Sequence, residues 1–155
     1  MKGDSRIIPM LNVLLAQELT AILQYEVHAS MVRHWGYDDL HRYIFKRAHD
    51  EMEHADKLIK RILFLEGTPV VSKINNIAIG SDVAKMFGAD QMAEKEAIVT
   101  YNQVIALAAE VGDGATRKML EHIVKEEDGH MAKIEENIAQ ISQMGLGAYL
   151  STKNK

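Results

Sequence analysis

The chain has 155 residues, a formal net charge of −4 and no cysteine. Its length suits one domain with a core of its own. The absence of cysteine excludes disulfides, thiolate zinc sites, Cys-ligated iron–sulfur clusters and a cysteine nucleophile. The acidic balance gives no basic surface for nucleic acid and favours the attraction of cations. Only two prolines and ten glycines occur, so the composition favours helix.

Four long segments carry apolar residues with the 3.6-residue period of an amphipathic helix. They run over residues 5–34, 38–65, 81–111 and 114–144. Glycine-containing turns at residues 35–37 and 112–114 separate the first segment from the second and the third from the fourth. We therefore expect two antiparallel helical hairpins, with Ser81 or Asp82 as the N-cap of the third helix.

The helical period fails over residues 66–80, which contain Gly67 and Pro69. This stretch is too long for a hairpin turn and long enough to run from one end of a bundle to the other. Two helical hairpins joined by one long crossover are typical of ferritin-like four-helix bundles. We expect this all-α fold over a single domain of residues 1–155, with residues 145–155 forming a short fifth helix.

No run of eighteen apolar residues, the length that would indicate a membrane span, occurs in the chain. Residues 7–16, which follow Lys2, resemble the apolar part of a secretory signal. However, Pro9 and Asn12 interrupt this stretch, and no small-residue cleavage site follows it. We therefore expect it to begin a helix of the mature protein, and we expect the protein in the cytoplasm.

The two halves of the chain repeat a pattern at a constant offset, which is the separation of Glu18 from Glu94. Each half has a glutamate, a tyrosine two helical turns later and a Glu-x-x-His motif in the next helix. The matched pairs are Glu18 with Glu94, Tyr25 with Tyr101, Glu51 with Glu127, and His54 with His130. The repeat predicts that these groups lie at matching depths in the two hairpins.

The glutamates and histidines of the repeat are predicted to point into the bundle. Residues three apart share a helix face, so each Glu-x-x-His motif can aim at one point. Glu18 and Glu94 lie within apolar stripes of their own helices. A single Glu-x-x-His motif is usually solvated, and the second copy with its upstream glutamate is what favours a metal site.

Four buried carboxylates require compensation by positive charge. Each close pair would repel by about 4 kcal/mol at an effective dielectric constant of about 20. Two divalent cations would balance four carboxylates and two neutral imidazoles, and this donor set suits iron or manganese better than zinc. The sequence therefore predicts a dinuclear metal centre of the kind known in carboxylate four-helix bundles. Arg47, one turn before Glu51, is placed to pair with that carboxylate but would neutralise only one charge.

Tyr25 and Tyr101 each follow a repeat glutamate by two helical turns. Their hydroxyls have three readings that the sequence leaves open. They are phenols with ordinary hydrogen bonds in the core, donors that orient the carboxylates, or redox-active groups.

Met52 faces away from Glu51 and His54, since successive residues turn by about 100° along a helix. An outer apolar stripe, of a kind that usually contacts a partner, comprises Phe45, Ala48, Met52, Ala55 and Ile59 with Leu19 and Leu23 of the first helix. Met52 is either a flexible interface residue or an axial haem ligand that meets its copy across a twofold axis. Five histidines lack a counterpart in the repeat and are expected at the surface or in an interface: His28, His34, His41, His49 and His122.

Longer motifs resemble the bacterioferritins over nearly the whole chain. They are Met1–Lys2–Gly3–Asp4, residues 18–25, Asp50–Glu51–Met52–Glu53–His54–Ala55–Asp56, Arg61–Ile62–Leu63–Phe64–Leu65–Glu66–Gly67, Glu94, Glu126–Glu127–Asp128–Gly129–His130 and Met144–Gly145–Leu146. The resemblance implies a hollow shell of 24 subunits built from dimers, a di-iron ferroxidase centre in each subunit, and haem b at the twofold interfaces.

The resemblance also assigns roles to individual residues. Glu18 and His54 would bind one iron, and Glu94 and His130 the other. Glu51 and Glu127 would bridge the two ions, and Met52 would be the haem ligand. Some members place a histidine beside Asp50 as an extra iron site on the inner surface, whereas this chain has Lys46 there, so we assign no role to Asp50. The tail at residues 147–151 is less polar than in many members, and we assume no iron route through it.

The predicted function is iron storage and detoxification by a ferroxidase that oxidises Fe²⁺ to Fe³⁺ with dioxygen or peroxide. The expected partners are further copies of this chain, iron ions and a ferredoxin-type reductant, with no nucleic acid and no membrane. The rival functions are a peroxide-scavenging di-iron or di-manganese protein, a haem-binding electron-transfer dimer, and a structural shell subunit. The intact glutamates argue against a shell subunit without a working site.

Overall fold

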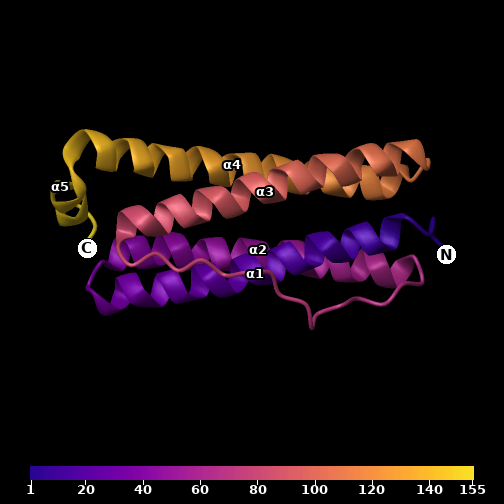
Figure 1. Cartoon of the computed structure of the whole chain (residues 1–155), viewed down its shortest axis with the longest axis horizontal. Helices are drawn as coiled ribbons and strands as arrows, with labels where there is room; N and C mark the ends of the chain where they lie inside the picture. Colours follow the sequence, from indigo (N-terminus) through magenta and orange to yellow (C-terminus); the bar gives the residue numbers. More distant parts are fainter.

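The structure, a computed structural model that describes residues 1–155, consists of five helices and no strand. The helices are α1 (Ile7–His34), α2 (Asp38–Phe64), α3 (Val83–Glu110), α4 (Gly114–Met144) and the short α5 (Leu146–Ser151). Figure 1 shows that the four long helices lie lengthwise beside one another, with α5 folded across the end of α4. The predicted ferritin-like four-helix bundle with a short C-terminal helix is confirmed, and the bounds of the four long helices differ from the predicted ones by at most two residues.

The ends of the helices follow from local sequence. Gly36 and Gly112 follow α1 and α3 with φ angles of 89° and 74°, a conformation that residues with a Cβ atom rarely adopt. At the start of α3 the Asp82 carboxylate accepts a hydrogen bond from the Lys85 backbone N–H. Of the two candidate N-caps, Asp82 is therefore the one used.

The crossover between α2 and α3 runs along α1 from one end of the bundle to the other, as the long loop in Figure 1 shows. Three polar side chains of α1, spaced four residues apart, accept hydrogen bonds from backbone N–H groups of the crossover. The pairs are Thr20 with Asn75 at 2.9 Å, Gln24 with Ala78 at 3.2 Å, and His28 with Gly80 at 3.0 Å. This row of acceptors fixes the path of the crossover over α1.

His28 is fully buried, so the expectation that it lies at the surface or in an interface was wrong. Its Nε2 accepts from Gly80, and the ring proton therefore lies on Nδ1, 3.0 Å from Asp90 Oδ1. The same Asp90 oxygen accepts from Gln24 Nε2 at 2.8 Å. The repeat gives no signal for this network because the network holds the crossover, a segment that occurs once in the chain.

The apolar core consists of two clusters, one toward each end of the bundle. The first is built around Leu11, Leu14, Leu15, Leu58, Ile62, Val104, Leu120 and Ile123. The second is built around Val32, Leu40, Ile44, Val83, Phe87, Ile134 and Tyr149. The glutamates and histidines of the repeat fall between these two clusters on every long helix, and its two tyrosines belong to the clusters themselves, so the fold holds a polar layer between two apolar ones.

Helix α1 contributes to both clusters. By length and hydropathy it is the one helix that could cross a membrane, yet 44% of its most apolar window is buried inside the bundle. A core helix of a bundle meets the same criteria, because it needs the same apolar side chains to contact its neighbours.

Gln24→Ala is expected to lower the free energy of unfolding by about 1–3 kcal/mol, because it removes the buried donor to Asp90 and the acceptor of the Ala78 N–H. Urea denaturation measures the loss, and hydrogen exchange at the Ala78 and Gly80 amides should accelerate. Glu26→Ala, an exposed change on the same helix, should stay within about 0.5 kcal/mol. Unchanged exchange at both amides would contradict the role assigned to Gln24.

Candidate dinuclear metal centre

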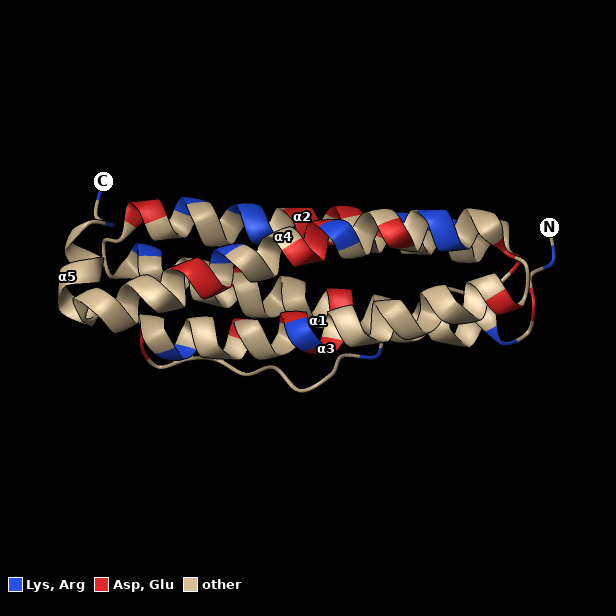
Figure 2. Ribbon diagram, turned by 90° about the horizontal axis from the view of Figure 1, so that it is seen from above, with Lys and Arg blue, Asp and Glu red and all other residues tan.

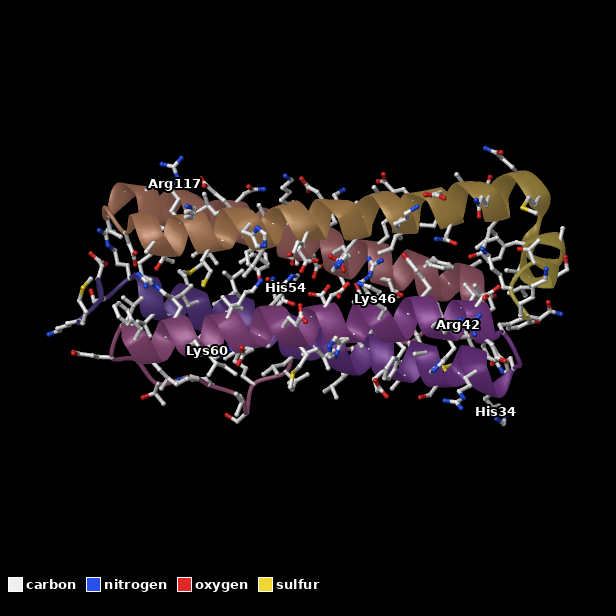
Figure 3. All side chains as sticks on the ribbon, turned by 180° about the vertical axis from the view of Figure 1, so that it is seen from behind. His34, Arg42, Lys46, His54, Lys60 and Arg117 are labelled. Carbon is white, nitrogen blue, oxygen red and sulfur yellow. The ribbon has the colours of Figure 1, made fainter.

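Six polar side chains from the four long helices meet midway along the bundle. They are Glu18 from α1, Glu51 and His54 from α2, Glu94 from α3, and Glu127 and His130 from α4, and each is buried. Figure 2 shows acidic residues on the long helices around the middle of the bundle, and Figure 3 shows His54 in the space between the helices. The structure thus brings together all six residues that the repeat predicted would converge.

The six side chains form two overlapping groups that are compact enough to hold metal ions. Within each group, one potential ligand atom per residue lies within 4.8 Å of all the others. The first group is Glu18, Glu51, His54 and Glu127, and the second is Glu51, Glu94, Glu127 and His130. Because Glu51 and Glu127 belong to both groups, they are the residues placed to bridge two ions.

Both histidines direct Nδ1 toward the carboxylates. His54 Nδ1 lies 2.8 Å from Glu127 Oε1 and 3.1 Å from Glu51 Oε2. His130 Nδ1 lies 3.0 Å from Glu51 Oε1 and 3.3 Å from Glu127 Oε2. The ring centroids are 6.0 Å apart. These matching distances show that the two hairpins present their Glu-x-x-His motifs in nearly equivalent ways.

Each buried tyrosine donates a hydrogen bond to a glutamate of the opposite half. Tyr25 Oη lies 2.5 Å from Glu94 Oε1, and Tyr101 Oη lies 2.5 Å from Glu18 Oε1. Burial, together with the nearby carboxylates, raises the pKa of both phenols well above the usual value, so they remain protonated donors. Of the readings that the sequence left open, this geometry favours the donor that orients a carboxylate.

Burial and mutual repulsion disturb the carboxylates. Burial and the nearby Glu18 and Glu127 raise the pKa of Glu51 well above its usual value. Burial and a hydrogen bond with Glu127 raise the pKa of Glu94 to about 8. Burial also opposes the ionisation of Glu127, but hydrogen bonds from Glu94 and His130 hold its pKa well below the usual value. Without metal, the centre therefore shares protons among its carboxylates.

The histidines carry positive charge when no metal is bound. Burial alone lowers the pKa of His54, but hydrogen bonds with Glu127 and Glu18 outweigh this and raise it to about 11. In the same way, hydrogen bonds with Glu127 and Glu94 outweigh burial and raise the pKa of His130 to about 9. Protons thus occupy the two nitrogen atoms that face the centre.

Two observations indicate that the protein's own side chains leave the carboxylates of the centre incompletely compensated. Arg47 makes no ion pair with Glu51 but donates to Tyr43 Oη at 3.1 Å, so the pairing suggested by the sequence does not form. Glu18 Oε2 and Glu94 Oε2 are buried without a hydrogen-bond partner. Buried carboxylate oxygens without a partner are costly, and divalent cations with a preference for oxygen ligands would satisfy them.

A small cavity of about 60 Å³ adjoins the centre. Its walls include Glu18, Glu94 and Glu127 of the centre, Asn75 of the crossover and the exposed Glu96 of α3. The cavity therefore lies between the centre and the outer face formed by α1, α3 and the crossover, and oxygen atoms that suit a cation line it.

Sequence reasoning gave no role to two acidic residues that the structure places beside the histidines. Asp50 Oδ2 lies 3.3 Å from His130 Nε2, and Glu126 Oε2 lies 2.5 Å from His54 Nε2. The repeat contained the signal for both residues, because Asp50 and Glu126 are themselves separated by its constant offset.

Met52 lies outside the centre, on the outer face of α2, where 56% of the residue is exposed. Phe45 and Leu23 nearby on the predicted stripe are also exposed, whereas Ala48 and Ala55 are buried in the core clusters, so their place in the stripe was wrong. Both short side chains pack within the apolar core instead. An exposed thioether among large apolar side chains fits a haem group that a second copy would cover, with one axial ligand from each copy.

Metal binding to the centre is expected to release protons. The pKa values of about 11 for His54 and about 9 for His130 lie above neutral pH, so both rings are protonated before the metal displaces the Nδ1 protons. At least about two protons per subunit, with a further contribution from the glutamates whose pKa is raised, should appear in solution when Co²⁺ is added at pH 7, and the affinity should fall as the pH is lowered. A pH-indicator dye measures the release, and binding without any release would contradict this charge state.

Comparison with known proteins gives one consistent result. Residues 8–144 match the family model described as the ferritin-like domain. A bacterioferritin of Rhodobacter capsulatus is 37% identical over 145 residues, covering 94% of this chain and 90% of the relative. A bacterioferritin of Streptomyces coelicolor is 36% identical over 152 residues, covering 98% and 91%. A bacterial ferritin of Paramagnetospirillum magnetotacticum is 40% identical over 158 residues, covering 98% and 94%. The chain therefore belongs to the bacterioferritins, within the ferritin-like domain family.

Proposed function

We propose that this protein stores iron and acts as a ferroxidase, oxidising Fe²⁺ to Fe³⁺ with dioxygen or peroxide at the dinuclear centre. The observation that carries the proposal is the pair of overlapping ligand groups, which share Glu51 and Glu127. In this proposal one Fe²⁺ substrate ion binds to Glu18 and His54, and the other binds to Glu94 and His130. The shared glutamates bridge the two ions.

The donor set suits the proposed reaction. Four carboxylates and two neutral imidazoles balance two Fe²⁺ ions, and the hard oxygen ligands favour the more highly charged Fe³⁺ product. The two iron ions together lose two electrons, which is the number needed to reduce dioxygen with two protons to hydrogen peroxide, or peroxide with two protons to water. Oxidation of the ions as a pair therefore avoids the release of one-electron products.

The proposal includes the assembly and the fate of the iron. We propose that dimers of this chain assemble into a 24-subunit shell in the cytoplasm and that Fe³⁺ moves from the centre into a mineral core. This proposal is supported by the similarity to bacterioferritins over nearly the whole chain. A peroxide-scavenging di-iron or di-manganese protein is the main rival, since the same donors suit manganese. A particle mass close to that of a dimer would oppose storage.

We further propose that haem b binds between two copies of the chain, with Met52 from each as an axial ligand. When bound, haem supplies one-electron transfer, and methionine ligation raises its potential. A ferredoxin-type reductant would deliver the electrons that release stored iron. The exposed Met52 and its large apolar neighbours support this assignment.

Glu94→Ala combined with Glu127→Ala is expected to abolish rapid Fe²⁺ oxidation and to leave assembly intact. The loss should be at least about 100-fold, because even partners that only orient metal ligands typically contribute 10–100-fold. The initial rate of Fe³⁺ absorbance after aerobic addition of Fe²⁺ measures it. Glu26→Ala combined with Glu135→Ala removes the same charge at exposed positions and should oxidise iron normally. Equal rates for the two double variants would refute the centre.

Met52→Leu should remove the absorbance of bound haem, and Met52→His should shift it, because the axial ligand is lost or replaced. Spectra of purified, haem-reconstituted protein measure both effects. Met92→Leu is the matched control, since Met92 is also exposed but lies on α3. A spectrum that is identical in the parent and in both Met52 variants would exclude Met52 as the ligand.

A further inference from the structure

In each histidine of the centre, Nδ1 faces the four glutamates of the centre and Nε2 faces the other way. Each Nε2 lies close to a further carboxylate outside this set of four. His54 Nε2 lies 2.5 Å from Glu126 Oε2, and His130 Nε2 lies 3.3 Å from Asp50 Oδ2. Asp50 and Glu126 hold equivalent places in the repeat, because each directly precedes a bridging glutamate. Glu126 thus forms a hydrogen bond with its histidine, and in the equivalent place of the other half Asp50 lies within ion-pair distance of its own.

These contacts are exchanged between the halves. Asp50 on α2 contacts His130 on α4, and Glu126 on α4 contacts His54 on α2. The tyrosines show the same exchange, since each hydroxyl donates to a glutamate of the other half. Glu18, His54, Glu94 and His130 are each proposed to bind a single metal ion. Each of these four side chains thus contacts a residue of the opposite hairpin, which supplies the non-bridging ligands of the other ion.

The contacts also decide which nitrogen can bind metal. A neutral imidazole has a single N–H, and an ionised carboxylate only accepts hydrogen bonds. A carboxylate at Nε2 therefore draws the N–H to that side and leaves the lone pair on Nδ1. In both histidines Nδ1 is the atom that faces the glutamates of the centre.

We propose that Asp50 and Glu126 are the positioning residues of the two metal-binding histidines. Each carboxylate fixes the tautomer and the ring orientation of a histidine from the opposite half, so that Nδ1 is presented to the metal. This inference rests on the proposed function, since it takes the six residues to be metal ligands. Carboxylates that hold the second nitrogen of a ligand histidine make that nitrogen a donor and the other a better ligand.

The two carboxylates differ in how firmly they are engaged. Glu126 makes the shorter contact with its histidine and also lies 3.1 Å from the exposed His122. Asp50 is shared with Lys46, whose Nζ lies 3.1 Å from it. Because Lys46 competes for Asp50, replacing Glu126 should have the larger effect.

Titration of the assembled, metal-stripped protein with Co²⁺ tests the inference through the visible absorbance of bound Co²⁺. The parent should bind two ions per subunit. Glu126→Ala should weaken one of the two by about 10–100-fold and leave the other unchanged. Glu126→Gln keeps an oxygen that accepts from Nε2 and should recover most of the affinity. Asp50→Ala and Asp50→Asn should form the same series, with a smaller loss.

Asp128→Ala is the control, because it removes the same charge at an exposed position of α4. If Glu126→Ala binds both ions as the parent does, the positioning role is wrong and the ferroxidase proposal stands. If the alanine and glutamine variants lose affinity equally, charge rather than orientation is responsible, and the inference is again overturned. A parent protein that binds no Co²⁺ at the centre would overturn both this inference and the proposed function.

Discussion

The structure depends on a single electrostatic constraint, the burial of four carboxylates within a few ångströms of one another. Such a cluster is unstable in an apolar interior unless protons or cations compensate it. In the metal-free state, protons on the histidines and on some of the glutamates provide that compensation. The same groups become ligands once the protons leave, so the cost of burying the charges is also the source of affinity for cations.

The rest of the fold keeps this cluster in place. The two apolar clusters on either side account for most of the buried side chains and tie all four long helices together. The crossover lies over α1 and is attached to it by Thr20, Gln24 and His28. The residues that stabilise the bundle by packing therefore lie toward its two ends, and the residues of the metal centre lie between them. This separation allows the middle layer to hold buried charges without disrupting the apolar packing.

Much of this arrangement follows from the sequence. The helical period and the glycine turns predict the helices closely, and the constant offset of the repeat predicts that the six residues of the centre converge. The errors arise where a role depends on neighbours distant in sequence. The burial of His28 depends on Asp90 and on the crossover, and the burial of Ala48 and Ala55 depends on how the long helices pack in the core. The repeat could have revealed Asp50 and Glu126, because they are separated by its constant offset. An acidic residue beside a Glu-x-x-His motif, however, is typical of a solvated helix face.

The exchanged contacts have a consequence for how such a centre could have originated. A single hairpin makes none of these contacts. Its histidine needs the carboxylate, and its first glutamate needs the tyrosine hydroxyl, that the opposite hairpin supplies. Two identical hairpins related by a rotation axis would satisfy all of them at once. A gene encoding only two helices could thus have produced a complete symmetric centre by self-association. Duplication of that gene, with the crossover joining the two copies, would have preserved the centre and allowed each half to diverge.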